Sequence, residues 1–159
     1  MMKKKICMVG EFSVGKTSLT QKFVKNVFSE KYLTTIGVKI DTVEVNDTKL
    51  ILWDVAGRDS LSPINSSYLV GAAGIVLVAD GTRQKTIESI PEIWATVEER
   101  IGNVPCVLAL NKADLENWNV DEETIERFKE LGWDVFETSA KEGAQVESLF
   151  HSLVAKLNK

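Results

Sequence analysis

The sequence predicts one α/β domain: a six-stranded, mostly parallel sheet with one antiparallel edge strand and helices on both faces. Short apolar runs alternate with amphipathic segments along the chain, as in strands joined by crossover helices. One hairpin interrupts this alternation and supplies the antiparallel edge. A length of 159 residues fits one hydrophobic core, and the chain contains no internal repeat, linker or low-complexity stretch. We therefore treat residues 1–159 as a single domain.

Six apolar runs are expected to form the strands. Two of them, VKIDTVEV and TKLILWD, form the hairpin and are joined by a two-residue turn at Asn46-Asp47. The other four are short apolar stretches between helical patterns, so we expect them in the parallel part of the sheet. The expected strands are residues 6–9, 38–45, 48–54, 74–80, 104–110 and 133–137.

Four amphipathic segments are expected to form helices. The first, SLTQKFVKN, follows the first strand; the second begins near Ile90, where Ser89 and Glu92 have the spacing of a capping box. We interpret residues 86–89 as a turn. Acidic residues 121–123 begin the third helix at its positive end, and Gly132 ends it. The core-facing positions expected on the last two helices are Ile125, Phe128, Leu131, Val146, Leu149, Phe150, Leu153 and Leu157.

Composition excludes several classes of function. The formal net charge is -4, so the chain has no basic field with which to grip nucleic acid. Its two cysteines, Cys7 and Cys106, lie inside apolar runs, which argues against a disulfide framework or a cysteine metal site. We find no signal peptide and no apolar run long enough to span a bilayer. We therefore expect a reduced, cytoplasmic protein.

A phosphate-binding loop follows the first strand. Residues 10–18, GEFSVGKTS, match the G-x-x-x-x-G-K-[ST] pattern in full, with a strand before it and a helix-forming segment after it. Glycines at both ends permit a tight loop whose N–H groups, with the helix terminus, complement phosphate oxygens. Lys16 can reach the outer phosphates, and the Thr17 hydroxyl can ligate Mg²⁺. The expected nucleotide-binding residues here are Gly10, Glu11, Phe12, Ser13, Val14, Gly15, Lys16, Thr17 and Ser18.

A second motif indicates which base is bound. Asn111-Lys112-Ala113-Asp114 follows the apolar run VPCVLAL, at the sheet edge where α/β proteins bind ligands. A carboxylate at Asp114 can accept two hydrogen bonds from the N1–H and exocyclic amine of guanine, a donor pair that adenine lacks. The stem of Lys112 can lie along a ring face. Taken alone, this short motif is equally compatible with an ordinary polar loop.

Two further segments are expected beside the base. Ser139, Ala140 and Lys141 follow the last strand and would meet the first motif at the same sheet edge. Phe28, after the first helix, could cover the base from the other side, or it could be an ordinary core aromatic.

Five motifs together resemble the small GTPases of the Ras superfamily. GEFSVGKT, a threonine in YLTTIG, WDVAG, NKAD and TSAK occur in the order and spacing of that superfamily, and the resemblance covers essentially the whole chain. TTIGVKI and the ungapped stretch from WDVAG to LVAD are most similar to the Rab branch. The resemblance places Trp53 and Tyr68 on two aromatics that Rab proteins present to effectors, with Ile40 in place of a usual Phe; plain core packing is the alternative. The chain has no lipid-bearing carboxyl-terminal box, so we expect no intrinsic membrane anchor; either this is a soluble relative or the chain has been trimmed.

The resemblance also implies a γ-phosphate sensor. Thr35 would ligate Mg²⁺ and contact the γ-phosphate, Asp54 would hold Mg²⁺ through a water, and the Gly57 N–H would bind the γ-phosphate. With Thr17, the expected metal site is therefore Thr17, Thr35 and Asp54, and the expected catalytic residues are Lys16, Thr35, Gly57 and Arg58.

Arg58 departs from the family pattern, which has glutamine at this position to orient the attacking water. A guanidinium has donors but no acceptor, so it cannot hold water in the same way. Three interpretations remain: hydrolysis is weak and the GTP-bound state is long-lived; Arg58 acts as a finger in cis; or it faces solvent and a partner supplies the catalytic group. Phe12 is a second departure, because its bulk could block an arginine from an activating partner.

The leading hypothesis is a monomeric GTP-binding switch that hydrolyses GTP slowly to GDP and phosphate, with effectors, an exchange factor and an activating protein as expected partners. A GTP-gated binding module whose hydrolysis Arg58 has silenced is the first alternative. An ATP-dependent kinase on the same loop is the second, and Asp114 argues against it. We expect Arg83 to be solvated at a strand end and His151, the only histidine, to have a surface or packing role.

Overall fold

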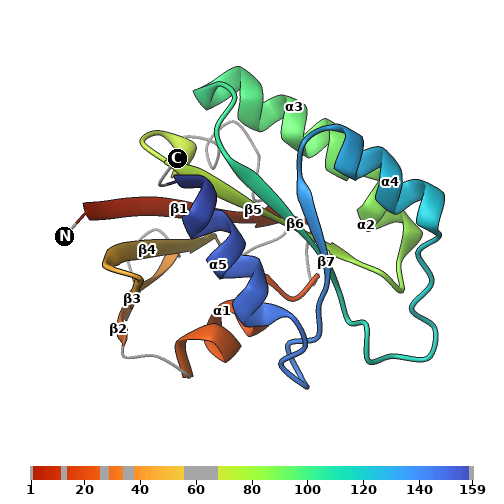
Figure 1. The fold of residues 1–159 in the computed structure, drawn as a ribbon, viewed down its shortest axis with the longest axis horizontal. Helices are drawn as coiled ribbons and strands as arrows, with labels where there is room; N and C mark the ends of the chain where they lie inside the picture. The colour runs from red at the N-terminus through yellow and green to blue at the C-terminus, as the bar shows by residue number, and fades with distance from the viewer. Residues whose placement is uncertain (1, 12–13, 26–28, 34–37, 56–67, 158–159) are drawn as a thin grey trace.

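The structure is a computed structural model that describes residues 2–11, 14–25, 29–33, 38–55 and 68–157. Within these ranges one sheet has the strand order β2-β3-β4-β1-β5-β6-β7 (Figure 1). The strands are β1 (Met2–Gly10), β2 (Ser29–Leu33), β3 (Val38–Val45), β4 (Thr48–Val55), β5 (Gly74–Asp80), β6 (Cys106–Asn111) and β7 (Asp134–Glu137). The predicted α/β class is confirmed, and all six expected strands are present.

The hairpin edge of the sheet has one more strand than the sequence patterns predicted. β3 pairs antiparallel with both β4 and β2, whereas β4, β1, β5, β6 and β7 pair in parallel. The residues of β2, SEKYL, lack an apolar alternation, so nothing in the local pattern distinguishes them from a loop. Both residues of the predicted β3–β4 turn have positive φ, 47° at Asn46 and 64° at Asp47, as a two-residue hairpin requires.

Helices cover both faces of the sheet, as expected (Figure 1). α1 and α5 pack on one face, where the rings of Phe23 and Phe150 stack with centroids 4.2 Å apart. Residues of α2, α3 and α4 pack with the core of the other face. The helices are α1 (Lys16–Lys25), α2 (Gln84–Glu88), α3 (Ile90–Ile101), α4 (Glu122–Glu130) and α5 (Val146–Leu157). Within the described ranges, no helix has the length and apolar character needed to cross a membrane.

Local helix signals were accurate for α4 and wrong beside α3. Asp121 caps α4 by accepting a hydrogen bond from the Thr124 N–H at 2.8 Å, and Gly132 follows its end at φ 90°. α3 begins at Ile90 as predicted, but residues 84–88, which overlap the predicted turn, form α2. Ser89 forms no capping box, because it has a helical backbone and its hydroxyl donates to the Thr86 carbonyl.

The predicted core-facing positions are confirmed except for one. Val146, Leu149, Phe150 and Leu153 are buried. Leu131 is 59% exposed, because it lies just beyond the last residue of α4, where the chain leaves the helical path.

Candidate nucleotide-binding site

The loop between β1 and α1 lies against two other strands. A side chain at Gly10 would place its Cβ 2.3 Å from the carbonyl oxygen of Val78 in β5. Gly15 has φ +102°, and a Cβ there would lie 2.2 Å from the side-chain nitrogen of Asn111. Both glycines of the motif are therefore required by close approach, and the second also by its backbone conformation.

Lys16 is held inside this loop. Only 7% of Lys16 is exposed, and its Nζ donates to the carbonyl oxygens of Gly10 and Glu11, both at 3.1 Å. Burial lowers the pKa of Lys16, while the carboxylates of Asp54 and Glu11 act in the opposite direction. A cation that has lost much of its hydration, with carbonyl oxygens as acceptors, is well suited to exchange them for phosphate oxygens.

Thr17 and Asp54 lie together, as the magnesium hypothesis requires. The Thr17 hydroxyl donates to Asp54 Oδ2 at 2.5 Å. Asp54 is 1% exposed, and its Oδ1 has no hydrogen-bond partner among the described residues. A hydroxyl beside a buried carboxylate with an unused oxygen fits the hard oxygen ligands that Mg²⁺ prefers. The described residues contain no cluster of three or more His, Cys, Asp or Glu side chains that could hold a metal ion.

Asn111 connects the predicted base-binding motif to the phosphate-binding loop through side-chain hydrogen bonds. Its side-chain nitrogen donates to the Val14 carbonyl at 2.9 Å, and its side-chain oxygen accepts from the Thr138 hydroxyl at 3.1 Å. Because Asn111 is only 2% exposed, both polar groups depend on these partners. Three segments that are distant in sequence therefore meet at one buried amide.

Asp114 and Ser139 bring the two predicted base-binding segments together. The Ser139 hydroxyl donates to Asp114 Oδ1 at 2.8 Å and accepts from the Glu142 N–H at 3.0 Å. The loops are also joined by the Ala113 N–H, which donates to the Thr138 carbonyl at 2.9 Å. The hydroxyl of Ser139 therefore orients the carboxylate that was predicted to read the base.

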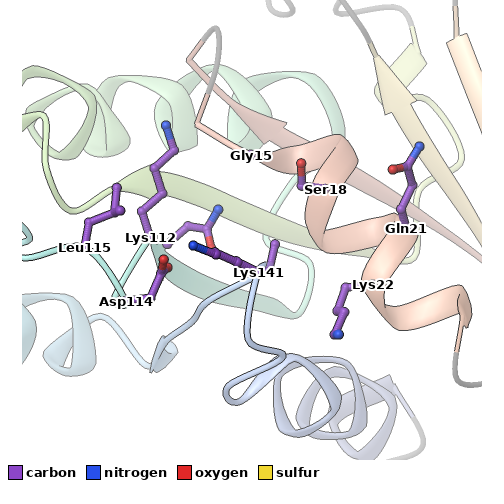
Figure 2. Close-up of a pocket in the computed structure, with 10 residues that line it drawn as sticks. Gly15, Ser18, Gln21, Lys22, Lys112, Asp114, Leu115 and Lys141 are labelled. Atoms are coloured by element: carbon purple, nitrogen blue, oxygen red, sulfur yellow. The ribbon is translucent and has the colours of Figure 1, made fainter.

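These groups surround a cavity of about 350 Å³ at the carboxyl edge of the sheet (Figure 2). One side comes from α1 and the loop before it, and the other from the segments after β6 and β7. Its lining residues are Gly15, Ser18, Gln21, Lys22, Asn111, Lys112, Asp114, Leu115, Ala140 and Lys141. Seven of the ten were predicted to bind the nucleotide: Gly15, Ser18, Asn111, Lys112, Asp114, Ala140 and Lys141.

The remaining predicted site residues are Phe12, Ser13, Phe28, Thr35, Gly57 and Arg58, and they lie outside the described residues. The predictions about the γ-phosphate sensor and the role of Arg58 therefore stay predictions.

One residue of this site, Asp80, was not predicted from the sequence. Asp80 is buried at the end of β5 and forms an ion pair with Lys112, Nζ to Oδ2 at 2.9 Å. A sequence signal for Asp80 was available: it is an acidic residue at the end of the apolar run GIVLVAD, as Asp54 is at the end of LILWD. Arg83, expected to be solvated, is 44% exposed and pairs with the same carboxylate at 3.1 Å.

Comparison with known proteins identifies the family. The model of the Ras family matches residues 5–159. The chain belongs to the Ras family of small GTPases. It is 39% identical to the Ras-related protein SEC4 of Saccharomyces cerevisiae, in an alignment that covers 96% of this chain and 74% of that protein. The resemblance to Rab-like small GTPases predicted from the motifs is confirmed, and with it the assignment as a GTP-binding, GTP-hydrolysing protein of this family.

Three predicted surface residues of this GTPase form a cluster. Ile40 in β3 is the register partner of Trp53 in β4, and the rings of Trp53 and Tyr68 have centroids 6.4 Å apart. Ile40 is buried at 5% exposure, whereas Trp53 and Tyr68 are half-buried. The Nζ of Lys5 lies 3.8 Å from the centroid of the Trp53 ring, which covers part of the indole with a cation.

Proposed function

We propose that this small GTPase is a slow switch: it binds GDP and GTP with Mg²⁺, hydrolyses GTP slowly, and signals through the loops that contain Thr35 and Arg58. The observation that carries the proposal is the shared cavity. Gly15 and Ser18 of the phosphate-binding segment line it together with Asp114 and Lys141 of the base-binding segments. A single nucleotide can therefore be bound through its phosphates and its base at the same time.

Selectivity for guanine would come from Asp114. Its carboxylate is oriented by Ser139 and can accept from the N1–H and exocyclic amine of guanine, whereas adenine offers no such pair of donors. This argument favours a GTPase over an ATP-dependent kinase. Binding of fluorescent GDP in a large excess of ATP tests it: displacement by ATP would contradict guanine selectivity.

Transition-state stabilisation would come from the phosphate loop. Lys16 is poised to transfer its hydrogen bonds from the loop carbonyls to phosphate oxygens, and the loop amides would neutralise further charge. Thr17 and Asp54 would hold Mg²⁺, with Thr35 as the third predicted ligand. When bound, the metal supplies charge neutralisation at the phosphate oxygens.

The slow rate follows from Arg58. An arginine lacks the acceptor with which the usual glutamine orients water, so we expect an intrinsic rate at or below the order of 10⁻⁴ s⁻¹. The experiment is single-turnover phosphate release from GTP-loaded protein, with wild type beside Arg58→Gln. A wild-type rate near zero that Gln raises identifies Arg58 as a brake on a long-lived switch.

The opposite results have distinct meanings. Wild-type turnover above about 10⁻² s⁻¹ without a partner contradicts slow hydrolysis, because that is the rate of an arginine finger in cis. Hydrolysis that Arg58→Gln slows makes the arginine catalytic. If neither protein hydrolyses GTP while both bind it, the alternative of a GTP-gated binding module is favoured.

The output surface would be formed by the half-buried Trp53 and Tyr68, which pack against the buried Ile40. This apolar, partly exposed group comes from β3, β4 and Tyr68, which follows the second predicted switch loop. Half-buried aromatics at a surface are efficient anchors for a partner protein. Effectors, an exchange factor and an activating protein are the partner classes that this proposal includes.

A further inference from the structure

The carboxylate of Asp80 collects four hydrogen-bond donors at the end of β5. Oδ1 accepts from the backbone N–H of Thr82 at 2.8 Å and from its hydroxyl at 2.6 Å. Oδ2 accepts from Arg83 Nε at 3.1 Å and from Lys112 Nζ at 2.9 Å. Because Asp80 is only 1% exposed, this arrangement holds both cations at a fixed place on the sheet edge.

Only one of these cations borders the nucleotide cavity. Lys112 lines it, between Asn111 and Asp114, whereas Arg83 does not. Lys112 has φ 68°, an uncommon conformation for a residue with a side chain, and its carbonyl accepts from the Leu115 N–H at 3.0 Å. Asp80 is the register partner of Asn111, so the carboxylate lies directly beside the base-binding motif.

The direction of the Lys112 side chain follows from this pairing. Asp114 is a carboxylate two residues away, yet the Lys112 ammonium pairs with Asp80 on the neighbouring strand. Figure 2 shows the Lys112 side chain extended, with its nitrogen directed away from the Asp114 carboxylate. The ammonium therefore does not occupy the acceptor that the base needs, and the aliphatic stem is stretched along the cavity wall.

We propose that Asp80 is a positioning residue for the guanine nucleotide: it anchors the Lys112 ammonium so that the Lys112 stem covers the base and the Asp114 carboxylate stays available to it. This inference rests on the proposed binding of guanine nucleotide to the cavity. Its functional consequence is slow nucleotide release, since a pre-ordered lysine loses less conformational freedom when the base binds.

A purely structural role for Asp80 makes a different prediction. The two bonds from Thr82 shape the turn after β5, and that role would continue without Lys112. Asp80→Asn separates the two roles, because the amide oxygen can still accept from Thr82 while the negative charge facing Lys112 is lost. Thr82→Val and Arg83→Gln are matched controls, since each removes one side-chain donor to Asp80 and neither residue lines the cavity.

The test measures the release rate of GDP labelled on its ribose, in the presence of Mg²⁺ and excess unlabelled GDP. We expect Asp80→Asn and Lys112→Met each to accelerate release about tenfold, the effect of losing one ordering contact of ordinary strength. The double variant should be no faster than Lys112→Met alone, since both changes interrupt one interaction. Thr82→Val and Arg83→Gln should release GDP at the wild-type rate.

Three outcomes would overturn the inference: an unchanged rate in Asp80→Asn, multiplication of the two effects in the double variant, or equal acceleration by Thr82→Val. If Asp80→Asn does not fold, Lys112→Met provides the test. An unchanged GDP release rate in Lys112→Met would overturn the inference, because Asp80 is proposed to act through Lys112. Failure of the wild type to bind labelled GDP overturns the proposed function itself. Wild-type binding with an unaffected Asp80→Asn overturns only the role of Asp80.

Discussion

Thr17 and Asp54 are joined across the sheet edge by a 2.5 Å hydrogen bond from the hydroxyl to Oδ2. The bond connects the first turn of α1 to the end of β4, where Asp54 lies between Met8 of β1 and Lys39 of β3 in register. Because Asp54 is buried, the sheet determines its position, and the helix brings Thr17 to it. The two oxygen groups that would hold the cation thus lie within hydrogen-bond distance of each other.

The first prediction concerns Thr17. Thr17→Ala removes the hydroxyl, so GDP should bind with an apparent Mg²⁺ affinity at least about tenfold weaker, as expected for loss of one ordered metal contact. Thr17→Ser is the matched control because it keeps the hydroxyl, and it should stay close to wild type. Titration of Mg²⁺ against the GDP release rate measures both. Equal Mg²⁺ dependence in wild type and Thr17→Ala would argue against a metal at this residue.

The second prediction compares two glycines with positive φ. Gly71→Ala has open space around the new Cβ, so its cost should be the backbone strain alone, about 1–2 kcal/mol. Gly15→Ala also places its Cβ 2.2 Å from the Asn111 amide, which is hydrogen-bonded on both sides and cannot move aside. We expect Gly15→Ala to cost about 1–3 kcal/mol more, from overpacking.

Urea unfolding without nucleotide measures the two glycine variants. Gly15→Ala should also fail to retain GDP, whereas Gly71→Ala should retain it. Equal unfolding midpoints for Gly15→Ala and Gly71→Ala would mean that the Asn111 side chain moves to accommodate the extra methyl group.

The third prediction concerns the Asn111 amide. Asn111→Ala leaves the Val14 carbonyl and the Thr138 hydroxyl without their partner in a buried site, at a cost of about 1–3 kcal/mol in the free energy of unfolding. Asn103→Ala, at an exposed position, is the control and should change stability little. Chemical unfolding measures the free energy of unfolding, and the GDP release rate reports on the nucleotide-binding site. A neutral Asn111→Ala would be inconsistent with a bridge between the two loops.

The fourth prediction is a pH dependence. Burial by itself raises the pKa of Asp80, but hydrogen bonds from Thr82 and the ammonium of Lys112 prevail and hold that pKa below its ordinary value of 3.8. The folded state therefore favours the charged carboxylate. The resulting stability is present above pH 3.8 and is lost as the pH falls through the lower folded pKa.

Wild type and Asp80→Asn should consequently differ most in stability at neutral pH. The difference in their urea midpoints should shrink below pH 3.8, because only wild type has this carboxyl to protonate. Measurements between pH 7 and pH 3 follow the trend, with Arg83→Gln as a control that keeps the titrating group. A difference that stays constant over this range would exclude a charge-dependent role for Asp80.

Local sequence patterns predicted the parts of the molecule that depend on neighbouring residues. The start of α4 at acidic residues 121–123, the turn at Asn46-Asp47 and the loop that ends at Lys16 each need only a few adjacent residues in the right order. β2 was not predictable in this way, since its five residues have no apolar pattern and become a strand only by pairing with β3. Tertiary pairing, rather than propensity, decides that segment.

Long-range partners explain what the sequence analysis missed at the site. Asn111 was expected near the base, but no pattern indicated that its amide would meet Val14 and Thr138. Asp80 was overlooked because its cationic partner at the cavity, Lys112, comes from the segment that follows the adjacent parallel strand rather than from the same loop. Such pairs become visible only once strand order and register are known.

The bridge from Asn111 to Val14 also bears on how the protein is made. The two residues are separated by 97 positions in the chain. At a synthesis rate of about 5–20 residues per second, Val14 leaves the peptidyl-transferase centre roughly 5–20 s before Asn111 is added. The phosphate loop is therefore translated before the segment that contains Asn111. The Val14 carbonyl can accept from the Asn111 amide only after the later half of the chain has been synthesised. A ribosome-bound chain that has not yet reached Asn111 carries the whole G-x-x-x-x-G-K-T signature without the amide that completes it.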